Sequence, residues 1–126
     1  MKKFQYQIVK YIHDIVTAEF VNVGIIVYQP ETNFLRCRFV SNLNRVSNFF
    51  KNVNEQQLFS AFEQFENEIK IESTKLNELI HTSLIEITNS ILPKDDSSLV
   101  CSELYFGIDI SPTSAFEDLF NRLIKQ

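Results

Sequence analysis

The sequence is poor in the residues on which small catalytic motifs depend. Its 126 residues include two glycines, two cysteines, two histidines and no tryptophan. Two glycines are too few for a phosphate-cradling loop, and the sequence has neither a Gly-x-Ser-x-Gly elbow nor a Cys/His cluster. Cys37 and Cys101 lie in apolar runs with no second cysteine or histidine at metal-ligand spacing, so we expect reduced, buried thiols. The sequence therefore predicts no catalytic site, no metal and no cofactor.

Long hydrophobic runs are missing as well. No stretch approaches the ~20 apolar residues that are needed to span a membrane. The apolar run that follows the two N-terminal lysines is interrupted by Gln5, Gln7 and Lys10, so it differs from the unbroken core of a signal peptide. We therefore expect a cytoplasmic protein that does not contact membranes.

Basic residues are in the minority, but they gather in the first part of the chain. The net charge is −4. Residues 1–51 carry seven Lys or Arg against three acidic residues, whereas the remainder carries five against thirteen. The overall negative charge disfavours wholesale binding to nucleic acid, because neutralising phosphates normally takes a basic surplus.

The composition fits one domain over residues 1–126, since 44% of the residues are hydrophobic and twelve are phenylalanine. Residues 4–12, 20–28 and 34–40 are rich in β-branched and aromatic side chains that alternate with polar ones, which predicts three strands. The short polar turns between them favour an antiparallel meander. Residues 42–54, rich in Asn and Ser, are expected to connect the strands to the second half of the chain.

The second half of the chain has mainly helical spacing. Apolar residues recur every three or four positions in 55–71 and again in 74–92, which predicts two amphipathic helices. After a polar loop at 94–98, residues 99–108 predict a strand, and Ser111-Pro112 predicts the capped start of a last helix. The order β-β-β-α-α-β-α indicates an α+β domain with an antiparallel or mixed sheet and helices packed on one face.

Strand alternation also suggests a binding surface. Val21, Val23, Ile25 and Val27 should share the face that lies under the helices. The opposite face should collect amides, aromatics and two arginines, which is a reasonable surface for a partner. Alternatively, this face is only solvated surface, and Gly24 marks a bulge or a close crossing of another segment. The predicted surface consists of Gln5, Gln7, Tyr11, Phe20, Asn22, Gly24, Tyr28, Arg36 and Arg38.

One group of residues, close together in the sequence, has side chains of the types that catalysis uses. His13, Asp14 and Glu19 could together hold a metal or perform acid–base chemistry, as a metal hydrolase would. Placement in a turn accounts for His13 and Asp14 equally well, because Asp is a favoured turn residue. Both interpretations stay open at this point.

The run from Glu19 to Tyr28, Glu-Phe-Val-Asn-Val-Gly-Ile-Ile-Val-Tyr, resembles an uncharacterised bacterial family known as domain of unknown function three-zero-three-seven. Residues 6–12 resemble its opening strand, and residues 115–124 resemble its last helix. The resemblance implies that Glu19, Asn22 and Gly24 are signature positions. It supplies no reaction, and it implies a gene neighbourhood with HipA-like serine/threonine kinases.

These observations favour a protein that binds another protein and is not an enzyme. The resemblance implies an accessory or antitoxin-like partner of a HipA-like kinase, with Glu19, Asn22, Gly24, Tyr28, Arg36 and Arg38 as the hypothetical binding residues. The alternative is a nucleic-acid-binding protein or nuclease that uses the basic face of the N-terminal sheet.

Overall fold

The computed structural model describes residues 2–14, 16–50, 52–76, 83–91, 99–109 and 111–124. These residues form one antiparallel sheet of five strands together with four α-helices, so the predicted α+β class is confirmed. The strands are β1 (Lys2–Asp14), β2 (Glu19–Gln29), β3 (Phe34–Phe39), β4 (Leu99–Cys101) and β5 (Tyr105–Asp109). The helices are α1 (Asn44–Phe49), α2 (Glu55–Thr74), α3 (Leu84–Ile91) and α4 (Pro112–Leu123), and the short 3-10 helix η1 (Pro30–Thr32) joins β2 to β3.

The N-terminal meander is confirmed, whereas the later elements differ from the prediction in two ways. The expected connector contains α1, and the expected strand at 99–108 is divided into β4 and β5. Of the expected helix at 74–92, residues 77–82 and 92 lie outside the described part of the chain, as does the expected loop at 94–98. Within the described ranges, no helix is long and apolar enough to cross a membrane.

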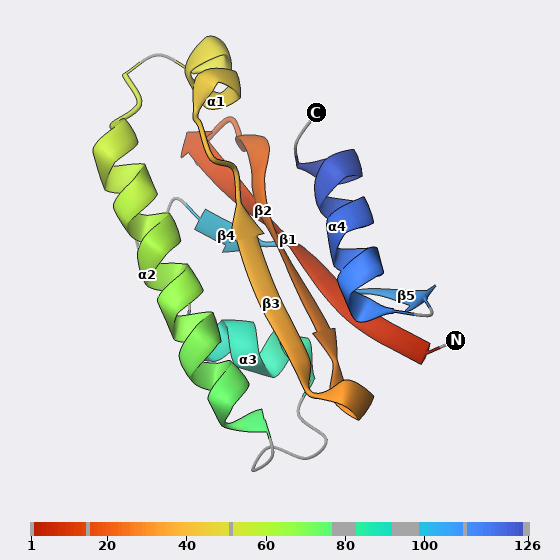
Figure 1. Cartoon of the computed structure of the whole chain (residues 1–126). Helices are drawn as coiled ribbons and strands as arrows, with labels where there is room; N and C mark the ends of the chain where they lie inside the picture. The colour runs from red at the N-terminus through yellow and green to blue at the C-terminus, as the bar shows by residue number, and fades with distance from the viewer. Residues whose placement is uncertain are drawn as a thin grey trace.

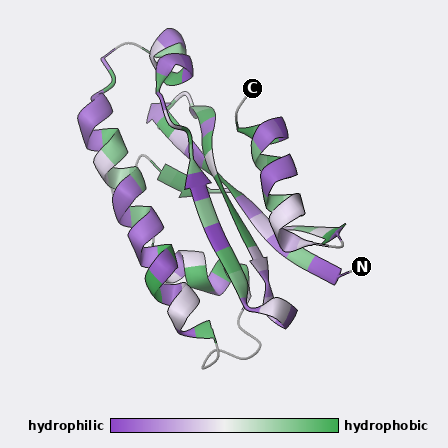
Figure 2. Cartoon of the chain, in the orientation of Figure 1, coloured by the Kyte–Doolittle hydropathy of each residue, from purple (hydrophilic) through white to green (hydrophobic). Residues whose placement is uncertain are grey.

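Helices cover both faces of the sheet, so the expectation of helices on one face was wrong. Figure 1 views the sheet from its β3 edge, with α2 and α3 on one side and α4 on the other. The larger core lies on the α2 side, where Leu58, Phe62, Phe65 and Ile69 pack on the strands. The smaller core lies on the α4 side, where Ala115, Phe116, Phe120 and Ile124 pack on Phe4, Ile25 and Val27. The central strand β2 is accordingly hydrophobic along most of its length (Figure 2).

A β-bulge in β2 explains why both faces of this strand are apolar. Val9 of β1 pairs with Gly24, but the next residue, Lys10, pairs with Asn22, so Val23 has no partner on β1. The extra residue reverses the alternation of the strand. Val21 and Val23 therefore belong to the larger core, as do Ile26 and Tyr28, whereas Ile25 and Val27 belong to the smaller one. The prediction that the four aliphatic residues share one face was wrong beyond Val23.

The edge beside β1 is formed by two short strands in succession. β4 pairs with Val9–Tyr11 and β5 pairs with Lys2–Tyr6, both antiparallel. Between them the ladder is continued by Ser102, whose N–H donates to the carbonyl of Ile8 at 2.8 Å while its hydroxyl accepts from the N–H of Ile8 at 2.9 Å. A side chain thus replaces one strand–strand hydrogen bond where the strand is interrupted.

Two glutamines of β1 connect the sheet to α3 and to this interruption. Gln7 is 2% exposed, and it donates to the carbonyl of Ser102 at 2.7 Å and accepts from the hydroxyl of Thr88 at 2.8 Å. Gln5 accepts from the N–H of Leu84, the first residue of α3, at 2.8 Å. Both amides are therefore interior hydrogen-bonding groups, since burying a polar group without partners would destabilise the fold.

The predicted binding surface is consequently divided between the two faces. Gln5, Gln7, Tyr11, Gly24 and Tyr28 lie on the face that α2 and α3 cover, and Tyr28 is 3% exposed. The remaining members, Phe20, Asn22, Arg36 and Arg38, lie on the opposite face. The polar residues Gln5 and Gln7 were predicted to be exposed, whereas their side chains make hydrogen bonds beneath the helices.

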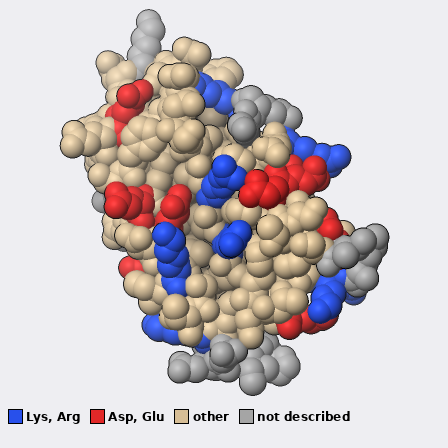
Figure 3. All heavy atoms as spheres, viewed as in Figure 1, with Lys and Arg blue, Asp and Glu red and all other residues tan. Residues whose placement is uncertain are grey.

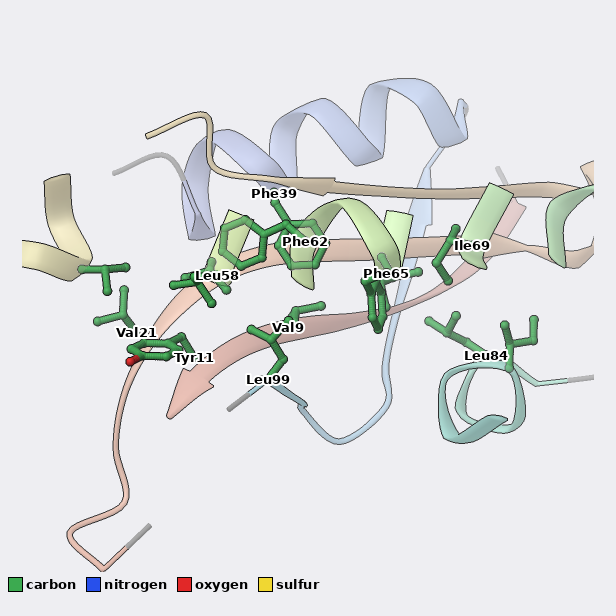
Figure 4. Packing of buried hydrophobic residues seen from close by; sticks show 14 of the residues in the cluster. Val9, Tyr11, Val21, Phe39, Leu58, Phe62, Phe65, Ile69, Leu84 and Leu99 are labelled. Atoms are coloured by element: carbon green, nitrogen blue, oxygen red, sulfur yellow. The ribbon is translucent and has the colours of Figure 1, made fainter. Parts of the chain in front are cut away.

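Both glycines make room for a phenylalanine ring of the neighbouring strand. A Cβ on Gly24 would lie 2.6 Å from Cδ1 of Phe39, and a Cβ on Gly107 would collide with the ring of Phe4. Phe39 in turn stacks on Phe62 of α2 with ring centroids 4.3 Å apart (Figure 4). The absence of a side chain at Gly24 therefore allows an aromatic contact between β3 and α2.

We predict that Gly24→Val lowers the free energy of unfolding by about 1–3 kcal/mol, because the added methyl groups must displace the Phe39 ring. Urea denaturation monitored by circular dichroism measures the change. The control combines Gly24→Ala with Phe39→Leu, and we expect the cost of the pair to be smaller than the sum of the single costs. Additive costs would mean that the ring is not the obstacle.

Candidate functional site

Strand β3 presents its two arginines on the α4 side of the sheet. Leu35, Cys37 and Phe39 pack toward the larger core, so Arg36 and Arg38 point the other way, and both are exposed. This agrees with their alternation in the sequence.

Arg38 is held in place by two contacts with α4. Its Nη1 lies 3.1 Å from Oε2 of Glu117, and its guanidinium carbon lies 4.3 Å from the ring centroid of Phe120. The side chains of Arg38 and Glu117 are 46% and 50% exposed, so the ion pair is solvated and contributes at most ~1 kcal/mol. The cation–π contact adds a similar amount and fixes the plane of the guanidinium.

Arg45 approaches the same place from α1. Helix α1 is anchored by Leu43 and Val46, which are 2% and 1% exposed in the larger core. The turn before it is fixed by Asn42, whose Oδ1 accepts from the N–H of Asn44 at 3.2 Å. Arg45 then donates from Nη1 to the carbonyl of Ile124, just after α4, at 3.5 Å. A cation at this end complements the partial negative charge of the last helical carbonyls.

These side chains surround a pocket of about 310 Å³ between the end of β3, α1 and the end of α4. We call it the arginine pocket. Its lining combines two guanidinium groups, one hydroxyl and one amide with three apolar side chains and with Phe39, whose ring packs in the larger core. The lining residues are Arg38, Phe39, Val40, Ser41, Asn42, Arg45, Phe120 and Ile124. Figure 3 shows basic groups near the middle of the β3 side of the molecule, with acidic groups on either side of them.

His13 and Asp14 make local contacts that account for their positions in and beside the turn. The His13 ring stacks on Phe50 with centroids 4.6 Å apart, and its Nδ1 lies 3.0 Å from the hydroxyl of Tyr11. Asp14 accepts from the N–H of Val16 at 2.8 Å, as an Asp in a turn does. Within the described ranges, no three His, Cys, Asp or Glu residues are grouped so that they could hold a metal ion.

Residues 6–124 match the family model described as Protein of unknown function (DUF3037). This match covers almost the whole chain. The chain belongs to the DUF3037 family. The predicted membership of this family is thereby confirmed. No curated protein and no solved structure gives a significant match.

Glu19, Asn22 and Gly24, the positions that the resemblance implied as a signature, do not converge on one site. Glu19 is exposed at the start of β2, and Gly24 is buried beneath Phe39. Asn22 is half-buried on the face away from α2, and its Oδ1 is buried without a hydrogen-bond partner in the described part of the chain. The bulge lies beyond Asn22, so it does not bring Asn22 and Glu19 to the same face. Gly24 therefore has a packing role.

Of the six predicted binding residues, Arg38 alone lines the arginine pocket. Arg36 is its exposed neighbour on the same face, whereas Tyr28 is buried in the larger core, where burial raises the pKa of its phenol. Sequence reasoning missed Arg45, because it lies in a segment interpreted as a connector. The missed signal was the spacing of Leu43 and Val46 around it, which is helical.

We predict that Arg38→Gln lowers the free energy of unfolding by about 1 kcal/mol, because it removes the contacts with Glu117 and Phe120. The matched variant Arg36→Gln should cost less than about 0.5 kcal/mol, as exposed substitutions generally do. Urea denaturation of both variants gives the comparison. Equal costs would show that Arg38 is not fixed by α4.

We also predict that both thiols of the folded protein react slowly with a disulfide reagent at pH 8. Burial raises the pKa of Cys37 well above its ordinary value and that of Cys101 to about 12. The reactive thiolate is therefore scarce at pH 8, and its fraction should increase as the pH rises toward these values. Colorimetric thiol counting with and without denaturant tests this, and two rapidly reacting thiols in the native protein would contradict it.

Proposed function

We propose that this DUF3037 protein is a non-enzymatic protein-binding module, an accessory or antitoxin-like partner of a HipA-like serine/threonine kinase, and that it binds its partner at the arginine pocket. The observation that supports this most is the pocket itself, which Arg38 and Arg45 line together with the apolar residues Val40, Phe120 and Ile124. Arginine beside buried apolar surface is the combination enriched at the energetic centres of protein interfaces.

The chemistry of the pocket suits binding better than catalysis. Guanidinium groups keep their protons at neutral pH, so they donate hydrogen bonds without exchanging protons with a substrate. Arg38 and Arg45 are each tethered by a contact with α4 or its end, which reduces the entropy that a partner must remove on binding. Both features favour recognition of a fixed group on another protein.

Charge around the pocket favours a protein over a nucleic acid. Arg38 is already paired with Glu117 of α4. Arg122, which also lies on α4, is paired with Asp118 at 3.5 Å. The phosphates of a nucleic acid would lie near these carboxylates, which repel them, as well as near the arginines. A protein surface can instead present a single complementary group to the pocket. Nucleic-acid binding would show a steep decrease of affinity with salt.

The test is to co-express the tagged chain with a HipA-like kinase and to purify the complex. We expect a stoichiometric complex that persists in moderate salt. Arg38→Glu with Arg45→Glu should weaken it by at least about tenfold, because the reversed charges leave partner groups opposed by like charges. The matched pair Arg36→Glu with Arg122→Glu makes the same change of net charge outside the pocket and should leave affinity within about threefold. No complex, or equal losses in the two pairs, would contradict the proposal.

A further inference from the structure

We propose further, resting on the function above, that the arginine pocket binds a carboxylate of the partner together with an apolar side chain next to it. The group expected there is the C-terminal carboxylate of the partner, carried by or adjoining a residue such as leucine or phenylalanine. The partner is thus recognised through a short apolar segment that ends in this carboxylate.

The charge of the pocket corresponds to one carboxylate. Two guanidinium groups line it, and Glu117 neutralises one of them through Arg38. Among the described residues, one positive charge then remains to be balanced, which a single carboxylate does. A phosphate group carries close to two negative charges at neutral pH, so it would exceed the uncompensated charge.

The lining of the pocket supplies several hydrogen-bond donors for such a group. A guanidinium has five N–H donors in a fixed fork that matches a carboxylate. In the described part of the chain, Arg38 and Arg45 each use Nη1 for one hydrogen bond to the protein. The oxygen of Asn42 is used by the N–H of Asn44, which leaves its amide nitrogen as the donor on that side. The hydroxyl of Ser41 adds a further donor from the same loop.

The apolar half of the lining and the size of the pocket define the rest of the ligand. Val40, Phe120 and Ile124 supply hydrocarbon surface beside the two arginines. The volume of about 310 Å³ is roughly twice that of a cavity of ~150 Å³ that holds one benzene ring. There is room for one large apolar side chain and a carboxylate, and not for a folded element.

The experiment uses two small probes that differ only in the C-terminal group. Acetyl-Leu-Phe with a free carboxylate is titrated into the full-length, isotope-labelled protein, and the backbone amide signals are followed by NMR. We expect saturable shifts centred on Ser41, Asn42 and Phe120, with a Kd of about 1 mM because the contacts are few. The uncharged amide of the same dipeptide should bind at least about tenfold more weakly. Equal binding of acid and amide, or no saturable shift, would overturn the inference.

Variants then assign the effect to the pocket. Arg45→Gln keeps a donor for the carbonyl of Ile124 but removes the charge, and it should weaken binding of the acid by about tenfold. Arg36→Gln and Arg122→Gln, which remove arginines on β3 and α4 outside the pocket, should leave it unchanged. The amide spectrum of each variant shows whether the fold is intact. Competition by inorganic phosphate at lower concentration than the acid would also overturn the inference.

The two proposals fail separately. If the acid does not bind while the kinase complex is lost in the Arg38/Arg45 double variant, the carboxylate inference is wrong and the protein-binding function stands. If the acid binds as expected but the Arg38/Arg45 double variant leaves the affinity of the kinase complex unchanged, the pocket is a carboxylate site and the proposed function is wrong.

Discussion

The bulge at Val23 is the constraint on which the arrangement of the other elements depends. Because it reverses the alternation of β2, Ile25 and Val27 face α4 while Ile26 and Tyr28 face α2. A regular strand would place Ile25 and Val27 under α2 with Val23 and turn Tyr28 toward α4. The large phenol would then lie where the smaller core packs closely against α4. The extra residue thus lets one strand contribute to two cores of different shape.

The same bulge also connects the core to the pocket. The carbonyl of Val23 accepts from the N–H of Val40 at 2.9 Å, which holds the end of β3 against β2. One residue earlier, Phe39 lies over Gly24 and stacks on α2. The chain therefore leaves the sheet in a fixed direction, and the loop at 41–42 enters α1 beside the end of α4. The walls of the arginine pocket come from elements that are far apart in the sequence but tied to this junction.

The sequence predicted what depends on local periodicity and missed what depends on long-range pairing. Alternation and helical spacing identified the meander, the helix at 55–71 and the last helix with its Ser111 cap, whose hydroxyl accepts from the N–H of Ser114. Gln7 was wrongly assigned to an exposed face, because its partners Thr88 and Ser102 lie more than eighty residues away. The position of the bulge has no local signature beyond Gly24. The arginine pocket could be predicted only in part, since α1 and α4 meet through tertiary packing alone.

The state of the arginines before a partner arrives bears on how selective the pocket can be. A solvated arginine loses much side-chain freedom when it is immobilised at an interface, at a cost of about 0.5–1.5 kcal/mol. Arg38 is already held between Phe120 and Glu117, and Arg45 is already directed to the carbonyl of Ile124, so a large part of this cost is met during folding. The ion pair with Glu117 also restricts the charge that the pocket can accept. Orientation by α4 and partial neutralisation by α4 therefore act together, and both favour a ligand with a single, well-placed negative charge.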